Sequence, residues 1–421
     1  MDYIPTLVVF GIVYGLIIFR NIRGVNIPIW ASMSFGAIAV LIIGSTGLDN
    51  SVSTINVDVI LFLLGMFVLV SGLESSGMLA YITNRILSYA KTPNQILFIV
   101  ICVMGVLSAF LINDTIALVA TPIVIGLAKQ MNVRPALFLI SLAFGVTLGS
   151  MMTPMGNPQN LLVSLHSGME FPLLTFLRYL ILPTIASLFC TYYIVKKYYK
   201  KELAQATMPF IVQSVVFDKS LAKKSSVLII ITVIGFFAIG IIKMFGMQTE
   251  LNFAHVAIFG GIALLVIGNK KRQVVSGINW QILVFFVAMF VFVQGLVDGG
   301  VIELFQKLLP LDSPDSPLSI INIIGTSVAL SQLVSNVPFV AIYLPILQDA
   351  GFADTTSWIA LAAGSTIAGN LTILGAASTV IILEAAQKKN GSSFSFIEFF
   401  KIGSIVTATN VAILVFFLVL V

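Results

Sequence analysis

Four polar clusters interrupt an otherwise apolar sequence, and their residue types suit the binding of small ions. Amide, hydroxyl and carboxylate oxygens are ligands for hard cations such as Na⁺, while amide N–H groups can donate to an anion. The clusters contain no Lys or Arg, so an anion would have to be held by amides and backbone dipoles. The candidate binding residues are Asn113, Asp114, Thr115, Thr153, Gly156, Asn157, Gln159, Asn160, Ser335, Asn336, Asn370, Thr372, Ser378 and Thr379.

Asp114 is the only acidic residue in these clusters. A carboxyl group in so apolar a segment is costly to bury, which makes it a candidate for function. We expect Asp114 to provide coupling, either by carrying a proton or by binding a cation. A Na⁺ site would lie near Asn113, Asp114, Asn157 and Asn336. The alternative is that Asp114 caps a helix; Asp58 and Glu384 receive less weight because both lie near the ends of apolar segments.

The composition places these clusters in a membrane protein. Of the 421 residues, 58% are apolar and 9% are charged, and the mean hydropathy is +1.08. Soluble chains carry about 25% charged residues. The apolar runs are continuous and do not alternate with polar residues, which predicts an all-α fold and excludes a β-barrel. Ten segments are candidate spans: 3–19, 27–47, 55–73, 135–165, 172–195, 225–246, 252–269, 278–297, 356–386 and 397–421.

Two segments of the chain are similar to each other. Residues 55–73 align without a gap with residues 278–296, at an offset of 223, and nine of 19 positions are identical. Related halves of a polytopic chain are typical of secondary transporters. We predict a first repeat over 1–195, a cytoplasmic linker over 196–224 and a second repeat over 225–421. Five spans per repeat is an odd number, so the repeats would be inverted in the membrane.

Each predicted repeat contains a hairpin and an interrupted helix. Regions 94–129 and 317–347 each suggest two half-length helices that meet at a polar tip, which predicts re-entrant hairpins; a pair of short spans around a surface loop is the alternative. Segment 135–165 contains Gly, Pro and polar residues, and segment 356–386 contains Gly and polar residues; both patterns favour a broken helix over an intact packing seam. Amphipathic stretches at 78–90 and 301–311 favour helices in the membrane interface.

The charges indicate how the chain lies across the bilayer. With ten alternating spans, 18 of the 22 Lys and Arg residues fall on one side, which the positive-inside rule makes cytoplasmic. Both termini would then be extracytoplasmic. The net charge of +5 therefore reports topology, and we expect no nucleic-acid partner. Cys102, Cys190, His166 and His255 form no metal motif, so no cofactor is expected.

Four sequence segments carry a resemblance to a known family: NDTIALVATPIVIGLA (113–128), MTPMGNPQNLLV (152–163), SNVPFVAIYLP (335–345) and AGNLTILGAASTVIILEA (368–385). With them the chain resembles the ion transporter superfamily, and within it the arsenite-permease and citrate-transporter-like branch, which is related to divalent anion:sodium symporters. The sodium-dependent dicarboxylate branch of the superfamily has Ser-Asn-Thr at both hairpin tips, whereas this chain has Asn113-Asp114-Thr115 and Ser335-Asn336-Val337. The resemblance implies an elevator mechanism and a homodimer.

Together these features predict a plasma-membrane secondary transporter that moves a small anion or oxyanion coupled to H⁺ or Na⁺. Two alternatives stay open: an arsenite or antimonite efflux permease, and a Na⁺/H⁺ antiporter that uses Asp114. We do not expect an enzyme, because the sequence offers no nucleophile–base pair, metal-ligand set or nucleotide-binding loop.

Overall fold

Long apolar helices dominate the structure. The computed structural model describes residues 3–18, 21–22, 25–208, 218–245, 251–308, 314, 316, 318–373, 375–390 and 393–419. In this part of the chain the only strands are the two-residue pair β1 (Asn21–Ile22) and β2 (Val25–Asn26), so the all-α prediction is confirmed. Seven described helical segments are long and apolar enough to cross a membrane. They are α4 (Val57–Ser76), α6–η1–α7 (Pro93–Phe98, Ile99–Val103, Met104–Leu111), α9–η2 (Pro135–Gly149, Ser150–Met152), α11 (Pro172–Tyr198), α13 (Lys219–Met244), α16 (Trp280–Asp298) and α22 (Phe396–Val419).

Three predicted spans are shorter than the sequence suggested. Helices α1 (Ile4–Ile18), α2 (Ile29–Ile42) and α14 (Phe253–Ile267) have 15, 14 and 15 residues. At 1.5 Å per residue they are roughly 21–23 Å long, less than the hydrocarbon core of about 30 Å. Helix α2 begins after Pro28, and the turn that follows it contains Gly44 at a φ of 73°. These helix-breaking residues limit the length of α2, and a hydropathy average over many residues does not register them.

Apolar side chains on several helices face outward. On α13 Ile230, Ile231 and Ile234 are more than half exposed, and on α14 Phe259 and Val266 are as well. A soluble monomer rarely exposes such continuous apolar faces. Contact with lipid explains them.

The first hairpin joins α7 to α8 (Asn113–Gln130), and the second joins α18 (Ser319–Val334) to α19 (Asn336–Asp349). A single residue connects the arms in each: Ile112 at φ 62° and Ser335 at φ 70°. A non-glycine residue at positive φ is unfavourable, so the surrounding contacts must hold both turns. The two turns lie 223 residues apart, at the offset of the repeat.

The hairpin arms are longer than the half-length helices that we expected. In the first hairpin the segment Pro93–Leu111 has 19 residues and α8 has 18, whereas α18 and α19 have 16 and 14. Thr92 caps the first arm and Pro93 opens it, and the π-helical turn η1 continues it without a break. The first arm is therefore long enough to cross a membrane.

Two helices are interrupted by eight residues each. Helix α9 ends through η2, and α10 (Pro158–His166) begins after residues 150–157. Helix α20 (Thr355–Ala368) is followed by residues 369–376 and then by α21 (Ala377–Asn390). Pro158 is the first residue of α10, where its missing N–H costs nothing, and the Asn157 side chain accepts from the Asn160 N–H at 2.8 Å.

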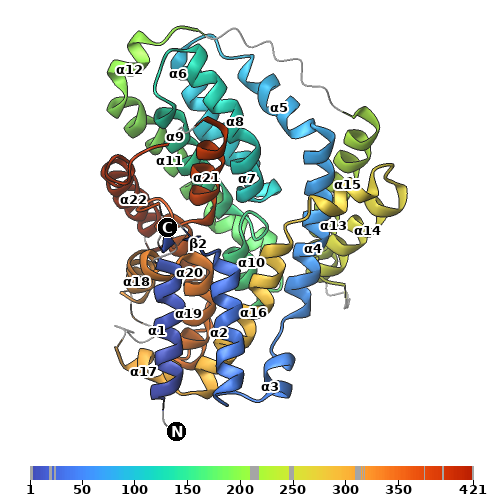
Figure 1. The fold of residues 1–421 in the computed structure, drawn as a ribbon, viewed down its shortest axis with the longest axis vertical. Helices are drawn as coiled ribbons and strands as arrows, with labels where there is room; N and C mark the ends of the chain where they lie inside the picture. The colour runs from blue at the N-terminus through green and yellow to red at the C-terminus, as the bar shows by residue number, and fades with distance from the viewer. Residues whose placement is uncertain are drawn as a thin grey trace.

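The two halves of the chain interleave at these breaks. Helix α10 packs against α19 and α20 of the second half, and α21 packs against α8 and α9 of the first half (Figure 1). Helices α1, α2, α4, α13, α14 and α16 pack mainly on one another. At the α4–α14 crossing Gly65 lies so close to Ala257 that a Cβ would meet the Ala257 carbonyl at 2.3 Å. The remaining short helices are α3 (Leu48–Ser53), α5 (Met78–Leu87), α12 (Lys200–Gln205), α15 (Lys271–Ser276) and α17 (Val301–Leu308).

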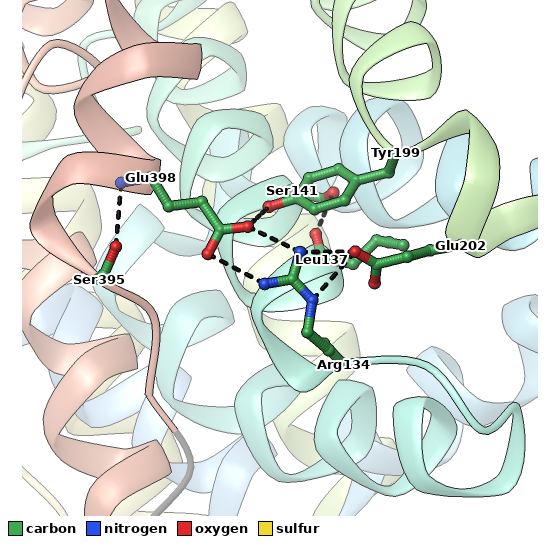
Figure 2. Close-up of polar contacts among 7 residues, drawn as sticks. All are labelled: Arg134, Leu137, Ser141, Tyr199, Glu202, Ser395 and Glu398. Carbon is green, nitrogen blue, oxygen red and sulfur yellow. Dashed lines mark hydrogen bonds and ion pairs between the residues drawn. The ribbon is translucent and has the colours of Figure 1, made fainter.

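An ion-pair cluster ties three parts of the chain together on the Lys/Arg-rich face. Arg134, just before α9, pairs with Glu202 of α12 at 2.5 Å and with Glu398 of α22 at 3.0 Å (Figure 2). The Tyr199 hydroxyl donates to Glu398 at 2.9 Å. Burial, followed by the negative charge of Glu398, raises the pKa of Tyr199, so its hydroxyl stays a donor. The cluster fixes the start of the first interrupted helix against α12 and α22.

Replacing Arg134 with Met is expected to lower the stability of the protein modestly. Glu398, 15% exposed, would lose its cation, while the exposure of Arg134 screens the pair, so the cost is about 1 kcal/mol. The melting temperature in detergent should fall by about 2 °C. Lys129→Met is the control, since Lys129 makes no ion pair with a described residue. Equal melting temperatures for both variants would show that the cluster contributes nothing.

Candidate functional site

Two cavities lie between the interrupted helices and the α4–α16 side of the molecule. Their volumes are about 1070 Å³ and 410 Å³, and we call them the large and the central cavity. Both sit beside the tip of the first hairpin. The residues that line both are Asp114, Asn279, Gln281, Ile282, Ile381 and Glu384.

Four helix N-termini meet at the central cavity. Its wall contains Asp114 from the first turn of α8, Pro158 at the start of α10, Val337 from the start of α19 and Ala377 at the start of α21. The peptide dipoles of a helix leave partial positive charge at its N-terminus, which favours an anion. Pro158 lacks an N–H but keeps the helix dipole. Four such ends favour an anion in this cavity without a cationic side chain.

Carboxyl groups line these cavities as well. Asp114, Glu74 and Glu384 line the large cavity, and none of the described residues around either cavity is Lys, Arg or His. Asp114, the only acid of the polar clusters, thus shares the large cavity with two acids from outside those clusters. Glu384 could have been found from sequence, because Ala377, Ile381 and Glu384 fall on one face of a helix.

The first tip is tied to the first break. The Asn113 N–H donates to the Gly156 carbonyl at 2.9 Å, and its side chain accepts from the Asp114 N–H at 2.8 Å. A Cβ on Gly156 would lie 2.2 Å from the Ser150 carbonyl oxygen, so only glycine fits there. Asn113 is buried, whereas Asp114 and Thr115 line the large cavity. Of the first tip, Asp114 and Thr115 thus face the space that a substrate could occupy.

The polar residues of the first break bind mainly to the backbone of the break. The Asn160 side chain donates to the carbonyls of Ser150, Met151 and Thr153 at 3.2, 3.1 and 3.0 Å. Thr366 of α20 donates to the Asn160 carbonyl oxygen at 3.2 Å and accepts from Asn157 at 3.2 Å.

Two further predicted site residues join this network. Gln159 donates to Thr366 at 3.4 Å, and the Thr153 hydroxyl donates to the Ala109 carbonyl of α7. None of Thr153, Gly156, Asn157, Gln159 and Asn160 is among the described residues that line the two cavities. That these residues bind substrate stays a prediction, whereas the contacts above show that they hold the interrupted segment in place.

The second tip and break hold polar atoms without partners. Asn336 is 4% exposed and Asn370 is fully buried, yet the Asn336 Oδ1, both polar side-chain atoms of Asn370 and the Thr379 hydroxyl have no hydrogen bond to a described residue. A Cβ on Gly369 would lie 3.2 Å from the Asn336 Nδ2, so the tip and the break are in contact. Buried amides without partners are costly, and a bound ion or water would satisfy them.

The other predicted residues of the second half have partners or face the cavity. Thr372 donates to Gln332 at 2.9 Å, and Ser378 lies 3.4 Å from the Thr147 hydroxyl. Ser335 lines the central cavity. Gln332, which sequence reasoning missed, also donates to the Ala368 carbonyl at 2.8 Å and so holds the end of α20.

The opposite wall comes from the repeated helix of the second half. Asn279 and Gln281, at the start of α16, line both cavities, and the Asn279 side chain makes no capping bond. Sequence reasoning missed these amides as site residues because they lie at the end of an apolar segment. They place neutral polar groups across from Asp114 and Glu384.

Known proteins of similar sequence and fold are membrane transporters. An uncharacterized transporter of Mycobacterium bovis is 27% identical over 86% of this chain and 85% of its own length. A silicon efflux transporter of Oryza sativa is 24% identical over 92% of this chain and 91% of its own length. The crystal structure of the Alcanivorax borkumensis YdaH transporter covers 99% of this chain and 97% of that chain, with a TM-score of 0.59 and 14% identity, so the two share a fold.

The family itself follows from a match to most of the chain. The sequence model described as citrate transporter covers residues 14–364 and thus both hairpins, the first break and the start of the second interrupted helix. This protein therefore belongs to the citrate transporter family, within the ion transporter superfamily, and is a membrane transporter.

Proposed function

We propose that this protein is a secondary active transporter that moves a small anion or oxyanion, coupled to H⁺ or Na⁺. The observation that carries the proposal is the meeting of four helix N-termini with Asp114 at the central cavity. A volume of about 410 Å³ suits a small organic or inorganic anion. The family name, citrate transporter, supports the same class of substrate.

Coupling follows from the carboxyl group at the anion site. At an effective dielectric constant of about 20, two unit negative charges about 5 Å apart repel each other by roughly 3 kcal/mol. An anion in the central cavity therefore binds well only when Asp114 is protonated or neutralised by a cation. Na⁺ could also bind the unpaired oxygens of Asn336 and Asn370. Substrate and coupling ion then bind together, which is what a symporter requires.

The two sides of the cavities suggest which parts move. The hairpins and interrupted helices carry Asp114, Ser335 and Glu384, whereas α4 and α16 form the facing wall. We propose that the former slide against the latter in an elevator mechanism, in a homodimer of the plasma membrane with the Lys/Arg-rich face in the cytoplasm.

An efflux permease for arsenite or antimonite is the second candidate. The rice relative exports silicon, and a cavity lined by carboxyl groups and amides admits a neutral hydroxylated metalloid more readily than a multivalent anion. A Na⁺/H⁺ antiporter would use Asp114 and Glu384 alone and would need no anion.

A binding screen followed by transport tests these candidates. Purified protein is heated with citrate, other small anions, arsenite or silicic acid, with and without Na⁺ and at several pH values. The proposed function predicts a rise in melting temperature with one anion, larger at low pH or with Na⁺. That anion should also drive H⁺ or Na⁺ into proteoliposomes. Sodium-driven proton flux without any anion would contradict the proposal in favour of the antiporter.

A further inference from the structure

A third and smaller cavity lies along the C-terminal half of α16, away from the end of that helix that follows the basic residues 270–272. Its volume is about 180 Å³, and α10, α16 and α19 form most of its wall, with His166, Val293 and Gln348 among the lining residues. Nothing in the proposed binding site uses it. We call it the His166 cavity.

The His166 cavity is built from the same positions of the repeat as the large cavity. Six of its eleven lining residues lie 223 positions from a residue that lines the large cavity, whereas the counterparts of Leu344, Pro345 and Gln348 do not line it. Helices α10 and α21 supply a second set of equivalent positions. The fifth and ninth residues of α10, Leu162 and His166, line the His166 cavity, and the fifth and ninth residues of α21 line the large cavity. The pairs are Thr54/Gly277, Phe290/Phe67, Val293/Val70, Gln294/Ser71, Val297/Glu74, Ala341/Leu118, Leu162/Ile381 and His166/Ala385.

The two equivalent cavities differ in size, and hydrogen bonds close the smaller one. The His166 Nδ1–H donates to the Leu162 carbonyl at 2.9 Å, so its Nε2 accepts from the Asn56 Nδ2 at 3.4 Å. The Asn56 Oδ1 is occupied by the Val59 N–H, and the Gln348 side chain donates to the His166 carbonyl at 3.1 Å. His166 thus joins α10 to α4 and to α19.

The equivalent contact is open at the large cavity. Asn279, the counterpart of Asn56 in the repeat, makes no capping bond and lines the large cavity. The position across from it holds Ala385, which cannot hydrogen-bond through its side chain. The equivalent positions are therefore joined by a hydrogen bond at the His166 cavity and are not joined at the large cavity.

We propose that the His166 cavity is the second opening of the transport path, closed in this structure, and that His166 is the positioning residue that holds it closed. The proposal rests on the transport path of the proposed function and adds the route to the opposite face. Alternating access then requires the large cavity to narrow when the opening at His166 widens; α16 lines both cavities, and most of their remaining walls occupy equivalent positions of the two repeats.

Single cysteines at equivalent positions test this. The chain has two cysteines, so Cys102→Ser with Cys190→Ser gives a background without thiols. Val293→Cys then reports on the His166 cavity, and Val70→Cys reports on the large cavity. A membrane-impermeant thiol reagent is applied to each face of oriented vesicles in turn. If the serine background does not fold, the native background serves with its own labelling subtracted.

His166→Ala is expected to change the two reporters in opposite directions. Loss of the contact should raise the labelling rate at Val293→Cys about fivefold and lower that at Val70→Cys, as one lost hydrogen bond shifts a two-state equilibrium. His255→Ala is the control, because His255 is the other histidine and, among the described residues, bonds only to Asn252 at the start of α14. It should leave both rates unchanged.

Three outcomes would overturn the proposal: no change at Val293→Cys, a rise at both cysteines, or the same response to His255→Ala. A rise at both would mean general loosening of the fold. The assay needs no substrate, so it can succeed even if the screen for a transported anion fails.

Discussion

Asp114→Asn is expected to uncouple transport from the ion gradient. The neutral amide removes the repulsion of roughly 3 kcal/mol between an ionised Asp114 and an anion at the four helix N-termini. At neutral pH without Na⁺ the variant should therefore bind the anion about 100-fold more tightly than the wild type. Its affinity should depend much less on pH and on Na⁺ than that of the wild type.

Transport assays in proteoliposomes separate binding from coupling. The variant should exchange labelled anion for unlabelled anion but should not accumulate it when an H⁺ or Na⁺ gradient is applied. Glu74→Gln is the matched control: Glu74 lines the large cavity but is not among the residues around the central one, so coupling should persist. Accumulation by Asp114→Asn with full dependence on the gradient would mean that another group, with Glu384 the first candidate, carries the coupling.

Asn160→Leu is expected to destabilise the first interrupted helix strongly. Asn160 is fully buried, and its side chain donates to the carbonyls of Ser150, Met151 and Thr153 and accepts from the Thr366 hydroxyl. Leucine has a similar size but makes none of these four hydrogen bonds, although the Ser150 and Thr153 carbonyls would keep bonds of 3.4 Å from the Asn157 Nδ2 and the Gly156 N–H. Each lost hydrogen bond costs about 1 kcal/mol, so we expect a total of at least about 3 kcal/mol.

The measurement is the melting temperature of the purified variant together with its yield. A fall of roughly 5 °C or more, or failure to accumulate as folded protein, is expected. Gln159→Leu is the control, because the adjacent Gln159 is also buried but makes one hydrogen bond of 3.4 Å to Thr366. If both variants melt alike, the carbonyls of the break do not depend on Asn160.

The sequence alone determined the class of fold and the positions of the breaks. Continuous apolar runs specify helices in lipid, because no other open structure satisfies the backbone there. Polar tips at Asn113 and Asn336, and the Gly-containing segments after them, of which the first also has prolines, end helices through local geometry. The structure breaks the chain at those segments, although α1, α2 and α14 are shorter than predicted. The inverted orientation of the repeats stays a prediction.

Only the tertiary structure decided which residues face the path and which hold it together. Asn160 and Asp114 look equivalent as polar residues near a break, yet one binds buried carbonyls and the other lines both cavities. Glu384 and Gln281 join Asp114 although about 270 and 167 residues of chain separate them from it. Contacts over such distances depend on how helices of the two halves interleave, and helical periodicity carries no information about that packing. The physical reason is that hydropathy and breaking residues act locally, whereas a binding site is made by the meeting of helix ends.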